Sequence, residues 1–166
     1  MISIIVAVAD YNVIGKNNSL IWHLPMDMQF FKEKTTGHCV IIGRKNYDSI
    51  PDKFRPLKNR TNIVISKALK SLSDGSILVH SIEDAITTAK QTGDNEIFII
   101  GGAEIYRQTI SICDRIYLTL IHHTFDGDAF FPELNKNEWK ETERRKGIVD
   151  DKNIYPHDFL TYDRMG

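Results

Sequence analysis

An acidic side chain on a predicted amphipathic helix is the first candidate for chemistry in this sequence. Asp27 comes two residues after Pro25. Proline fixes φ and has no N–H to donate, so Pro25 suits the first position of a helix. The helix is predicted to run to about Thr36, where Gly37 ends it. Asp27 therefore falls in the first helical turn.

The helical period places Asp27 among apolar side chains. On this period one stripe of the predicted helix is formed by Leu24, Met28, Phe31 and Thr35. A carboxylate inside an apolar stripe is costly unless a cation or a hydrogen-bond donor meets it. An acid in the first turn also complements the helix dipole, and this stretch alone favours that simpler interpretation.

A glycine followed by two basic residues stands where a predicted strand meets a predicted helix. In Gly43-Arg44-Lys45-Asn46, free backbone N–H groups and the positive helix end favour a phosphate, and the two cations add charge. Lys67, just after the strand that ends at Ser66, supplies another cation. A turn of this composition is equally compatible with a solvated surface.

Paired glycines form a second junction of the same kind. Gly101 and Gly102 follow an apolar strand and precede a helix, so a ligand can approach the bare backbone closely. The pattern is neither a Walker loop nor a GxGxxG fingerprint, and a tight turn packed on the sheet is the alternative. Two such junctions together suggest a dinucleotide that is held differently from the usual Rossmann turn.

Two further groups of polar residues are less specific. Arg60, between a loop and a strand, could hold a carboxylate in a bidentate fork or could be a surface cation. His122 and His123, with Asp126 and Asp128, resemble a metal cluster. Adjacent strand residues point to opposite faces, however, so the two histidines cannot easily share an ion, and we predict no metal site.

Composition favours one ordinary globular domain over residues 1–166. The chain is 42% hydrophobic and 26% charged with a net charge of -1, which argues against a broad nucleic-acid surface or a polybasic membrane contact. Cys39 and Cys113 lie in or beside apolar segments without ligand spacing, so we expect reduced core thiols. No run is long enough for a membrane helix, and Asp10 interrupts the first apolar run. A soluble cytoplasmic protein is expected.

The elements that must position these residues alternate along the chain. Strands are predicted at residues 2–9, 39–43, 61–66, 77–79, 96–100 and 115–122. Besides the Asp27 helix, helices are predicted at residues 44–50, from Ser81 to about Gly93, and at 103–110. Residues 10–20, 52–59 and 67–76 are predicted loops, and residues 139–144 and 154–162 a closing antiparallel pair. The fold class is α/β, with a mostly parallel twisted central sheet and flanking helices.

Ligands of such sheets bind at the carboxyl ends of the strands. The candidate groups all follow strands or lie one helix away, which is why we treat them as one site. At this point the sequence resembles the dihydrofolate reductase family of the bacterial type over nearly its whole length. The residues that carry the resemblance are Ile14-Gly15, Trp22-His23-Leu24-Pro25-Met26-Asp27, Phe31, Gly43-Arg44, Arg60, Ile100-Gly101-Gly102, Tyr106, Thr119, Gly127-Asp128 and Phe131-Pro132.

The resemblance implies an NADPH-dependent enzyme that reduces dihydrofolate to tetrahydrofolate for one-carbon metabolism. Asp27 would bind the amino-pyrimidine edge of the pterin and support protonation of N5, and Thr119 would hydrogen-bond Asp27. Trp22 and Tyr106 are implied beside the reacting atoms. The remaining substrate contacts that the resemblance implies are Ile5 and Ile100 through carbonyls, Phe31, Ile50 and Leu57 around the rings, and Arg60 on the glutamate α-carboxylate.

The resemblance also implies where NADPH lies. Arg44, Lys67 and His80 would recognise the 2′-phosphate, and residues 12–20 would form a lid over the nicotinamide, steadied by Asp128. The implied cofactor residues are Ala7, Ile14, Gly15, Asn18, Ser19, Leu20, Gly43, Arg44, Lys45, Asn46, Ile65, Ser66, Lys67, His80, Ile100, Gly101, Gly102, Ala103, Glu104, Ile105 and Tyr106. A monomer is expected.

The sequence departs from the family pattern at a few places. Ile21 replaces a usual proline at the lid hinge, Asn46 a common threonine, and Tyr47 a common tryptophan. Residues 51–53 lengthen a loop, and Glu104 puts an acid near the cofactor phosphates. Two other functions stay open: a reductase of the same fold acting on a riboflavin-precursor pyrimidine, and a non-catalytic nucleotide-binding module. Neither would need Asp27, Phe31 and Arg60 in this arrangement.

Overall fold

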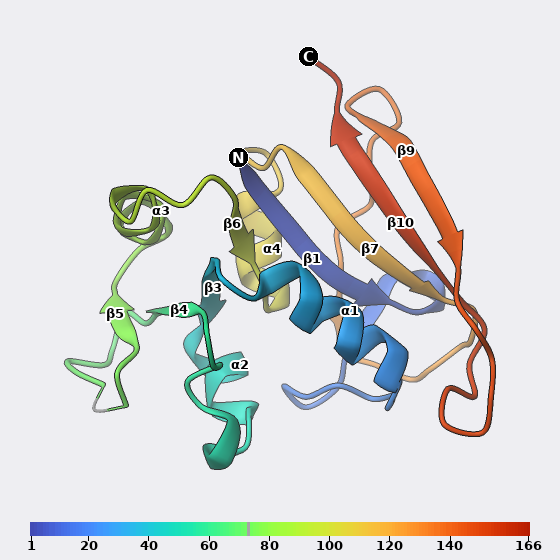
Figure 1. Ribbon diagram of the computed structural model, residues 1–166, viewed down its shortest axis with the longest axis horizontal. Coiled ribbons are helices and arrows are strands. Elements are labelled where there is room, and N and C mark those ends of the chain that lie inside the picture. Colours follow the sequence, from blue (N-terminus) through green and yellow to red (C-terminus); the bar gives the residue numbers. More distant parts are fainter. Residues whose placement is uncertain (73) are drawn as a thin grey trace.

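A twisted eight-stranded sheet forms the centre of the protein (Figure 1). The computed structural model describes residues 1–72 and 74–166. The strands of the sheet lie in the order β5-β4-β3-β6-β1-β7-β10-β9. Their bounds are β1 Ile2–Val8, β3 Cys39–Gly43, β4 Thr61–Ile65, β5 Ile77–Val79, β6 Ile97–Ile99, β7 Arg115–Ile121, β9 Trp139–Lys146 and β10 His157–Arg164.

The sheet is mostly parallel, as the sequence predicted. From β5 to β7 every neighbouring pair is parallel, and Ile4 of β1 lies between Ile99 of β6 and Ile116 of β7. These strands are rich in Ile and Val because both of their faces are buried. β10 runs antiparallel to β7 and β9, which confirms the closing pair with somewhat different bounds.

In residues 1–72 and 74–166, four α-helices connect the strands, close to their predicted bounds. They are α1 Pro25–Thr35, α2 Arg44–Ser49, α3 Ile82–Gln91 and α4 Ala103–Thr109. α1 begins at its proline, and Gly37 follows its end with φ +87°. α3 begins after Ser81, whose side chain accepts a hydrogen bond from the N–H of Asp84 at 3.0 Å. The predicted loop 52–59 also contains a short 3-10 helix, Asp52–Phe54.

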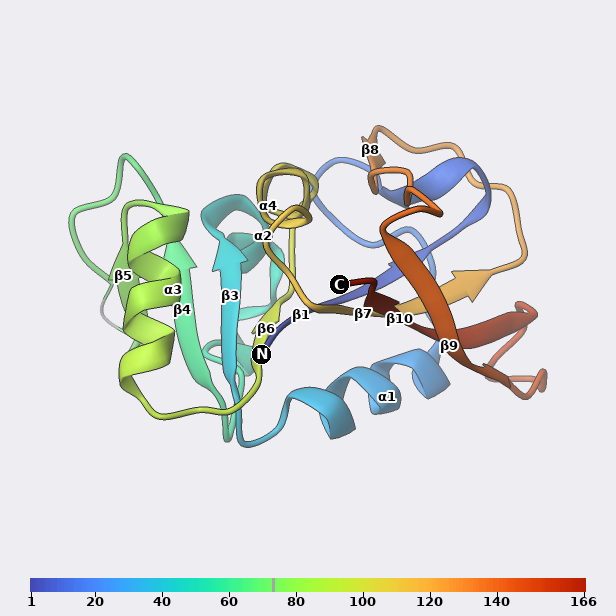
Figure 2. The same ribbon diagram turned by 90° about the horizontal axis from the view of Figure 1, so that it is seen from above.

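The helices cover opposite faces of the sheet. Ala85 and Ala89 of α3 and Ile105 of α4 pack with the larger core cluster, on one face. Phe30 and Phe31 of α1 pack in a second cluster with alternate strand residues, and Tyr47 of α2 packs in a third with Ile42 and Val64. Alternation along the strands puts these clusters on the other face. Figure 2 shows α1 and α4 on the two sides of the sheet.

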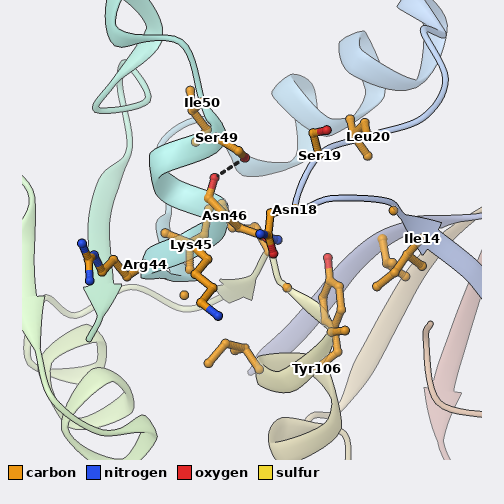
Figure 3. A pocket seen from close by; sticks show the side chains of 18 of the residues that line it. Ile14, Asn18, Ser19, Leu20, Arg44, Lys45, Asn46, Ser49, Ile50 and Tyr106 are labelled. Atoms are coloured by element: carbon orange, nitrogen blue, oxygen red, sulfur yellow. Dashed lines mark hydrogen bonds between the residues drawn. The ribbon is translucent and has the colours of Figure 1, made fainter. Parts of the chain in front are cut away.

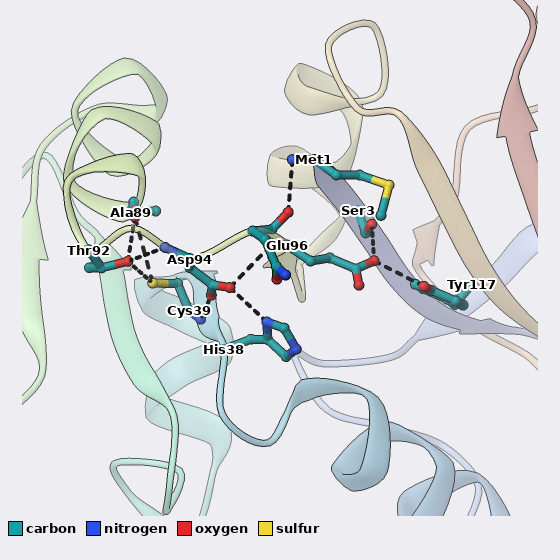
Figure 4. Close-up of polar contacts among 10 residues, drawn as sticks. Met1, Ser3, His38, Cys39, Ala89, Thr92, Asp94, Glu96 and Tyr117 are labelled. Atoms are coloured by element: carbon teal, nitrogen blue, oxygen red, sulfur yellow. Dashed lines mark hydrogen bonds and ion pairs between the residues drawn. The ribbon is translucent and has the colours of Figure 1, made fainter.

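Polar side chains join the elements at the sheet edge where the parallel strands begin (Figure 4). The carboxylate of Asp94 accepts hydrogen bonds from the N–H of Cys39 at 2.6 Å and pairs with His38 Nδ1 at 2.8 Å. Glu96 accepts from Ser3 Oγ at 2.7 Å and from the Tyr117 hydroxyl at 3.0 Å. Function is therefore expected at the opposite, carboxyl edge.

Residues 10–20 are more ordered than the predicted loop. They contain a 3-10 helix, Asp10–Asn12, and a short strand, β2 Val13–Gly15, which pairs antiparallel with β8 Ala129–Phe130. The partner of β2 lies more than a hundred positions away, so local sequence could not reveal the pairing. The predicted connector at residues 67–76 includes Ser73, which lies outside the described residues.

The predicted apolar stripe of α1 is wrong at one position. Met28 is 55% exposed, whereas Phe30 packs its ring 4.7 Å from that of Phe159. The helix lies along the rim of a cleft, so a side chain on its inner stripe can face open space. Met28 lines the cleft, as Phe31 does, whereas Leu24 and Thr35 are buried.

The cysteines and the helix lengths agree with a globular core. Cys39 and Cys113 are both buried and unpaired, in different parts of the fold. Within the described residues, none of the helices has the length and apolar character that crossing a membrane requires.

Candidate active site

A large cleft opens at the carboxyl edge of the parallel strands. Its walls come from α1, α2, the glycine junction before α4, the β4–β5 region and the segment 14–20. Figure 3 shows Lys45 and Asn46 on one side, Ile14 and Leu20 of that segment on the other, and Tyr106 between them. The predicted residues that line the cleft are Ile5, Ala7, Ile14, Gly15, Asn18, Ser19, Leu20, Asp27, Phe31, Gly43, Arg44, Lys45, Asn46, Ile50, Leu57, Arg60, Ile65, Ser66, Lys67, His80, Ile100, Gly102, Ala103, Glu104, Ile105 and Tyr106.

Three predicted site residues lie directly behind this wall. Thr119 is 1% exposed and Trp22 is 6% exposed, while Gly101 is covered by Asn46 and Tyr106. The indole Nε1 of Trp22 has no hydrogen-bond acceptor among the described residues. A buried donor without an acceptor is unusual in a native protein, so Trp22 is suited to donate to a bound molecule.

Asp27 is held at the cleft by Thr119 of β7. The Thr119 hydroxyl donates a hydrogen bond of 2.6 Å to Asp27 Oδ1. Burial raises the pKa of Asp27 above its usual range, and the Thr119 hydrogen bond and the nearby His157 offset part of this effect. Burial disfavours the charged carboxylate, so the neutral acid persists to higher pH than for an exposed aspartate.

Tyr106 of α4 connects the glycine junction to the central strand. Its hydroxyl donates to the carbonyl of Ile5 at 2.9 Å. Burial, and then the charge of Asp27, raises the pKa of Tyr106, so the phenol remains a neutral donor. The ring also lies close to Gly101, where an added Cβ would be 3.2 Å from the hydroxyl oxygen. Tyr106 therefore fixes the floor of the cleft.

Arg60 presents a free guanidinium at the end of the cleft near α1. Its Nε donates to the carbonyl of Lys58 at 2.9 Å and its Nη1 donates to Thr35 Oγ1 at 3.2 Å. In the part of the chain that the structure describes, no carboxylate pairs with it, and burial lowers the pKa of Arg60. A positioned cation without an acidic partner is ready to bind an anion in a bidentate fork.

The two predicted phosphate junctions meet in space. The N–H of Gly43 donates to the carbonyl of Gly101 at 2.8 Å, and Asn46 of α2 lies against the glycine pair. A Cβ on Gly102 would lie 2.6 Å from Asn46 Nδ2, and Gly101 has φ +117°. The peptide bond between the two glycines is cis. Only glycine fits this junction without displacing Asn46.

Basic groups gather beyond the junction. Arg44 forms an ion pair with Asp48 of its own helix, with 3.3 Å between Nε and Oδ2. His80 Nδ1 lies 2.8 Å from the carbonyl of Ser66, so its ring is oriented at this end of the cleft. Glu104, the acid expected near the cofactor phosphates, forms an ion pair with Arg107 and accepts a hydrogen bond from Gln108 Nε2 at 2.7 Å. These partners offset its charge.

The segment that follows β2 is tied to the loop before β8. The backbone N–H of Asn17 lies 3.2 Å and 3.3 Å from the carboxylate oxygens of Asp128, whose own N–H donates to Gly15 at 3.0 Å. Lys16 forms an exposed ion pair of 2.7 Å with Asp126. The expected contact between the lid and Asp128 is present.

Sequence reasoning missed several residues of the cleft wall. Polar side chains on α1 such as Gln29 and Lys32 look like a solvated helix face, and nothing local shows that this face borders a cleft. Helical spacing from Asp27 could have suggested them. The missed residues are Val6, His23, Pro25, Met28, Gln29, Lys32, Ile42, Ser49, Pro51, Lys53, Phe54, Lys58, Ala68, Ser81, Ile82, Glu83, Gln108 and Ala129.

The two adjacent histidines bind different neighbours. His122 Nε2 pairs with Asp158 at 3.1 Å, while the ring of His123 packs 4.6 Å from Phe125. Among the described residues, no group of histidine, cysteine or acidic side chains is arranged to hold a metal ion.

The fold and the site together define a class. A parallel sheet with a glycine junction, a basic rim and a half-buried acid in one cleft is typical of α/β oxidoreductases that use a nicotinamide dinucleotide. The chain belongs to the dihydrofolate reductase family, because the family model described as "Dihydrofolate reductase" matches residues 1–164.

Individual relatives agree over nearly their full lengths. The chain is 43% identical over 164 residues to dihydrofolate reductase of Bacillus subtilis, covering 99% of this chain and 95% of that protein. It is 43% identical over 162 residues to the Haemophilus influenzae enzyme, covering 98% of each. A solved structure, dihydrofolate reductase from Enterococcus faecalis complexed with NADP(H) and RAB-propyl, superposes with TM-score 0.90 at 38% identity, covering 100% of this chain and 97% of that one.

Proposed function

We propose a specific role for each group of cleft residues in the NADPH-dependent reduction of 7,8-dihydrofolate to 5,6,7,8-tetrahydrofolate. Family membership gives this chain that activity. The observation that carries the assignment of roles is the half-buried Asp27 carboxyl, which Thr119 holds in the same cleft as the glycine junction. A nucleotide-binding module has no use for such an acid.

The α1 side of the cleft is proposed to bind dihydrofolate. Asp27 pairs with the amino-pyrimidine edge of the pterin, and the carbonyls of Ile5 and Ile100 line the pocket beside it. Phe31, Ile50 and Leu57, which all face the cleft, enclose the pterin and its benzoyl ring. Arg60 holds the glutamate α-carboxylate, which supplies the anion that this guanidinium lacks in the protein.

The glycine junction and the basic rim are proposed to hold NADPH, which supplies the hydride. The glycine junction fits the group, because Gly102 lines the cleft with bare backbone and any larger residue there would displace Asn46, which also lines the cleft. Backbone N–H groups at the start of α2 and α4 face its phosphates. Arg44, Lys67 and His80 are assigned to the 2′-phosphate, because they line the cleft together beyond the junction.

Asp27 is proposed to support delivery of the proton to N5. Its raised pKa keeps the carboxyl protonated closer to neutral pH than an exposed aspartate. Trp22 Nε1 donates to a group bound beside Asp27, and Tyr106 holds the floor below the reacting rings. The segment 12–20 covers the rings and excludes water, and Asp128 steadies it. Placing two flat rings in contact is mainly an effect of orientation.

We also propose that the chain acts as one domain over residues 1–166, as a cytoplasmic monomer without a nucleic-acid partner. The support is compositional: a net charge of -1 leaves no excess of cations for a polyanion. One continuous sheet uses strands from both ends of the chain, which favours a single folding unit.

The test is oxidation of NADPH by the purified protein with dihydrofolate, run beside NADH and beside two variants. We expect oxidation to require dihydrofolate and to prefer NADPH. Arg44→Ala should reduce that preference by about tenfold, because a charged hydrogen bond to phosphate contributes about 1.5–3 kcal/mol. Lys90→Ala, at an exposed position in the last turn of α3 that does not line the cleft, is the matched control. NADPH binding without turnover would instead support the binding module, and turnover of a pyrimidine substrate the alternative reductase.

A further inference from the structure

The helix that carries Asp27 receives its N-terminal cap from a distant part of the chain. Its own N-cap residue, Leu24, offers no side-chain acceptor, and Pro25 has no N–H. The N–H of Met26 instead donates to Asn153 Oδ1 at 2.8 Å, across 127 positions of sequence. Asn153 is 6% exposed and belongs to the loop of residues 147–156 that joins β9 to β10.

Asp150 fixes the orientation of the Asn153 side chain. Its Oδ1 accepts hydrogen bonds from the backbone N–H of Asn153 at 2.7 Å and from Asn153 Nδ2 at 3.1 Å. The backbone N–H of Asp150 donates in turn to the Asn153 carbonyl at 3.0 Å. Because the amide nitrogen is engaged here, the amide oxygen is directed at Met26. The acceptor is therefore preorganised.

The same loop is joined both to α1 and to the strand that carries Thr119. The N–H of Ile148 lies 3.4 Å from the sulfur of Met26, a second contact with the first turn. The N–H of His122, just after β7, donates to the Pro156 carbonyl at 2.8 Å. The loop thus connects the two elements whose side chains meet in the hydrogen bond between Asp27 and Thr119.

We propose that Asn153 is a positioning residue for the reduction: by holding Met26, it sets where Asp27 lies relative to Thr119 and the cleft. The proposal rests on the proposed role of Asp27. The N–H groups of Asp27 and Met28 both donate to the Leu24 carbonyl, at 3.0 Å and 3.1 Å. The distant amide is therefore the side-chain acceptor that the described residues provide for the N–H groups of this turn.

Loss of the hydrogen bond between Asn153 and Met26 should change the pH dependence of the rate, which a loss of stability alone would not do. The pKa of Asp27 is set first by burial and then by the Thr119 hydroxyl and His157, whereas the nearby Tyr106 phenol responds to the charge of Asp27. The Asn153 amide adds no charge. If the first turn shifts, water reaches Asp27 and its pKa falls toward the usual value. The rate of hydride transfer should then decline at a lower pH than in the parent protein.

The experiment follows hydride transfer by stopped flow across pH, with NADPH and dihydrofolate. For Asn153→Ala we expect a rate about tenfold lower, since a small misplacement of a reacting group is costly. The pH midpoint should move to lower pH, and the KM for NADPH should stay within about twofold of the parent value because the cofactor groups lie elsewhere. Lys152→Ala, at an adjacent exposed position, is the matched control and should behave as the parent.

A second variant, Asn153→Ser, keeps a short side-chain oxygen that can accept from the Met26 N–H without adding charge. It should therefore recover part of the rate that Asn153→Ala loses and move the pH midpoint back toward the parental value. An Asn153→Ala protein that is merely less heat-stable, with the parental rate and midpoint, would overturn the proposal. If Asn153→Ala does not fold, Asp150→Ala is measured in its place. A parental rate and a parental pH midpoint of hydride transfer in that variant would also overturn the proposal.

The variant Asp27→Asn in the same assay separates this proposal from the proposed function. If Asp27→Asn turns over like the parent across the pH range, the role given to Asp27 fails. If Asp27→Asn is impaired while Asn153→Ala is parental, the acid keeps its role and only the positioning by Asn153 fails.

Discussion

At the scale of single residues, the site depends on two charged side chains, Asp27 and Arg60, that have no oppositely charged hydrogen-bond partner among the described residues. Asp27 has one hydroxyl donor and no cation within its hydrogen-bonding contacts among the described residues, and Arg60 has a carbonyl and a hydroxyl but no carboxylate. Each is therefore more strongly disposed toward a ligand than a paired group would be. The two groups lie at different parts of one cleft, which matches a substrate with a ring at one end and an acid at the other.

The variant Asp27→Asn tests whether Asp27 supports delivery of the proton to N5. At neutral pH we expect turnover to fall by about a hundredfold, since a positioned acid contributes roughly 10²–10⁴ in rate. Activity should recover partly in acid, where solvent can protonate the substrate. The measurement is kcat from pH 5 to 9, in which the parent rate falls as pH rises through the raised pKa of Asp27. Equal pH profiles for variant and parent would contradict the assignment.

The same substitution should stabilise the folded protein. A carboxyl whose pKa is raised by folding destabilises the native state above its unfolded pKa of about 3.9, and the cost disappears below it. Asp27→Asn removes that cost, so its melting temperature at pH 7 should exceed the parent value by a few degrees. The difference should vanish near pH 3.5, as differential scanning calorimetry can show.

Arg60→Ala tests the tail of the substrate. We expect the KM for dihydrofolate to rise about tenfold to a hundredfold, since a charge-assisted pair contributes about 1.5–3 kcal/mol. A dihydropterin without the glutamate tail is the matched control, because its KM should be the same for variant and parent. A parallel rise for both substrates would mean that the variant disturbs the pocket rather than loses a carboxylate contact.

Much of the residue scale could be predicted from the sequence, for a physical reason. Asp27, Arg60 and the glycine pair are residue types that stand out against their local patterns, and the structure brings them to one cleft. The exposure of Met28 could not be predicted, because periodicity gives the face of a helix but not whether protein or a cleft lies opposite. Asn153 gave no local signal, since its partner lies 127 positions away.

At the scale of elements, two junctions depend on each other. α2 places Asn46 against the glycines that precede α4, so neither element can change alone. For Gly102→Ala we expect the Kd for NADPH to rise about tenfold or more, because the new methyl would displace Asn46 or the backbone. Adding Asn46→Ala should restore part of the affinity, measured by fluorescence quenching. Independent effects of the two substitutions would contradict the steric explanation.

Two contacts hold the lid. In one, the backbone N–H of Asn17 donates to the Asp128 carboxylate; in the other, the side chains of Lys16 and Asp126 form an ion pair. Asp128→Ala removes the acceptor for Asn17, so we expect about a fivefold lower rate of hydride transfer, in line with a lost charge-assisted bond. Asp126→Ala removes only an exposed ion pair with Lys16 and should stay near the parent rate. The comparison by stopped flow distinguishes an ordered lid from general surface charge.

The ends of helices could be predicted where a particular residue type begins or ends the helix. Pro25, Gly37 and Ser81 mark helix ends through their own backbone or side-chain chemistry, and the structure agrees. The strand pair β2 and β8 was missed because two-residue and three-residue strands carry no periodicity of their own. Pairing between distant short segments is decided by the tertiary fold.

At the scale of the whole molecule, the cleft is lined by segments from most of the chain before residue 130. A ligand that contacts α1, α2, α4 and the β4–β5 region binds only when these are assembled. NADPH at about a hundred times its Kd should therefore add about 2.7 kcal/mol to the free energy of unfolding. That corresponds to a melting temperature about 5–10 °C higher. NADH at the same concentration should give a smaller shift, and no shift with NADPH would contradict the cofactor site.

The strand order affects how the chain can fold while the ribosome synthesises it. β1 is the first strand to be synthesised, yet its two neighbours are β6 and β7, so Ile2 pairs with Ile97 and Ser3 with Arg115. At about 5–20 residues per second, a ribosome needs roughly 5–20 s to deliver those partners. During that interval an isoleucine-rich β1 has no edge to join. The nascent chain is therefore a natural client for chaperones that shield apolar segments, and fragments that end before residue 97 should be aggregation-prone.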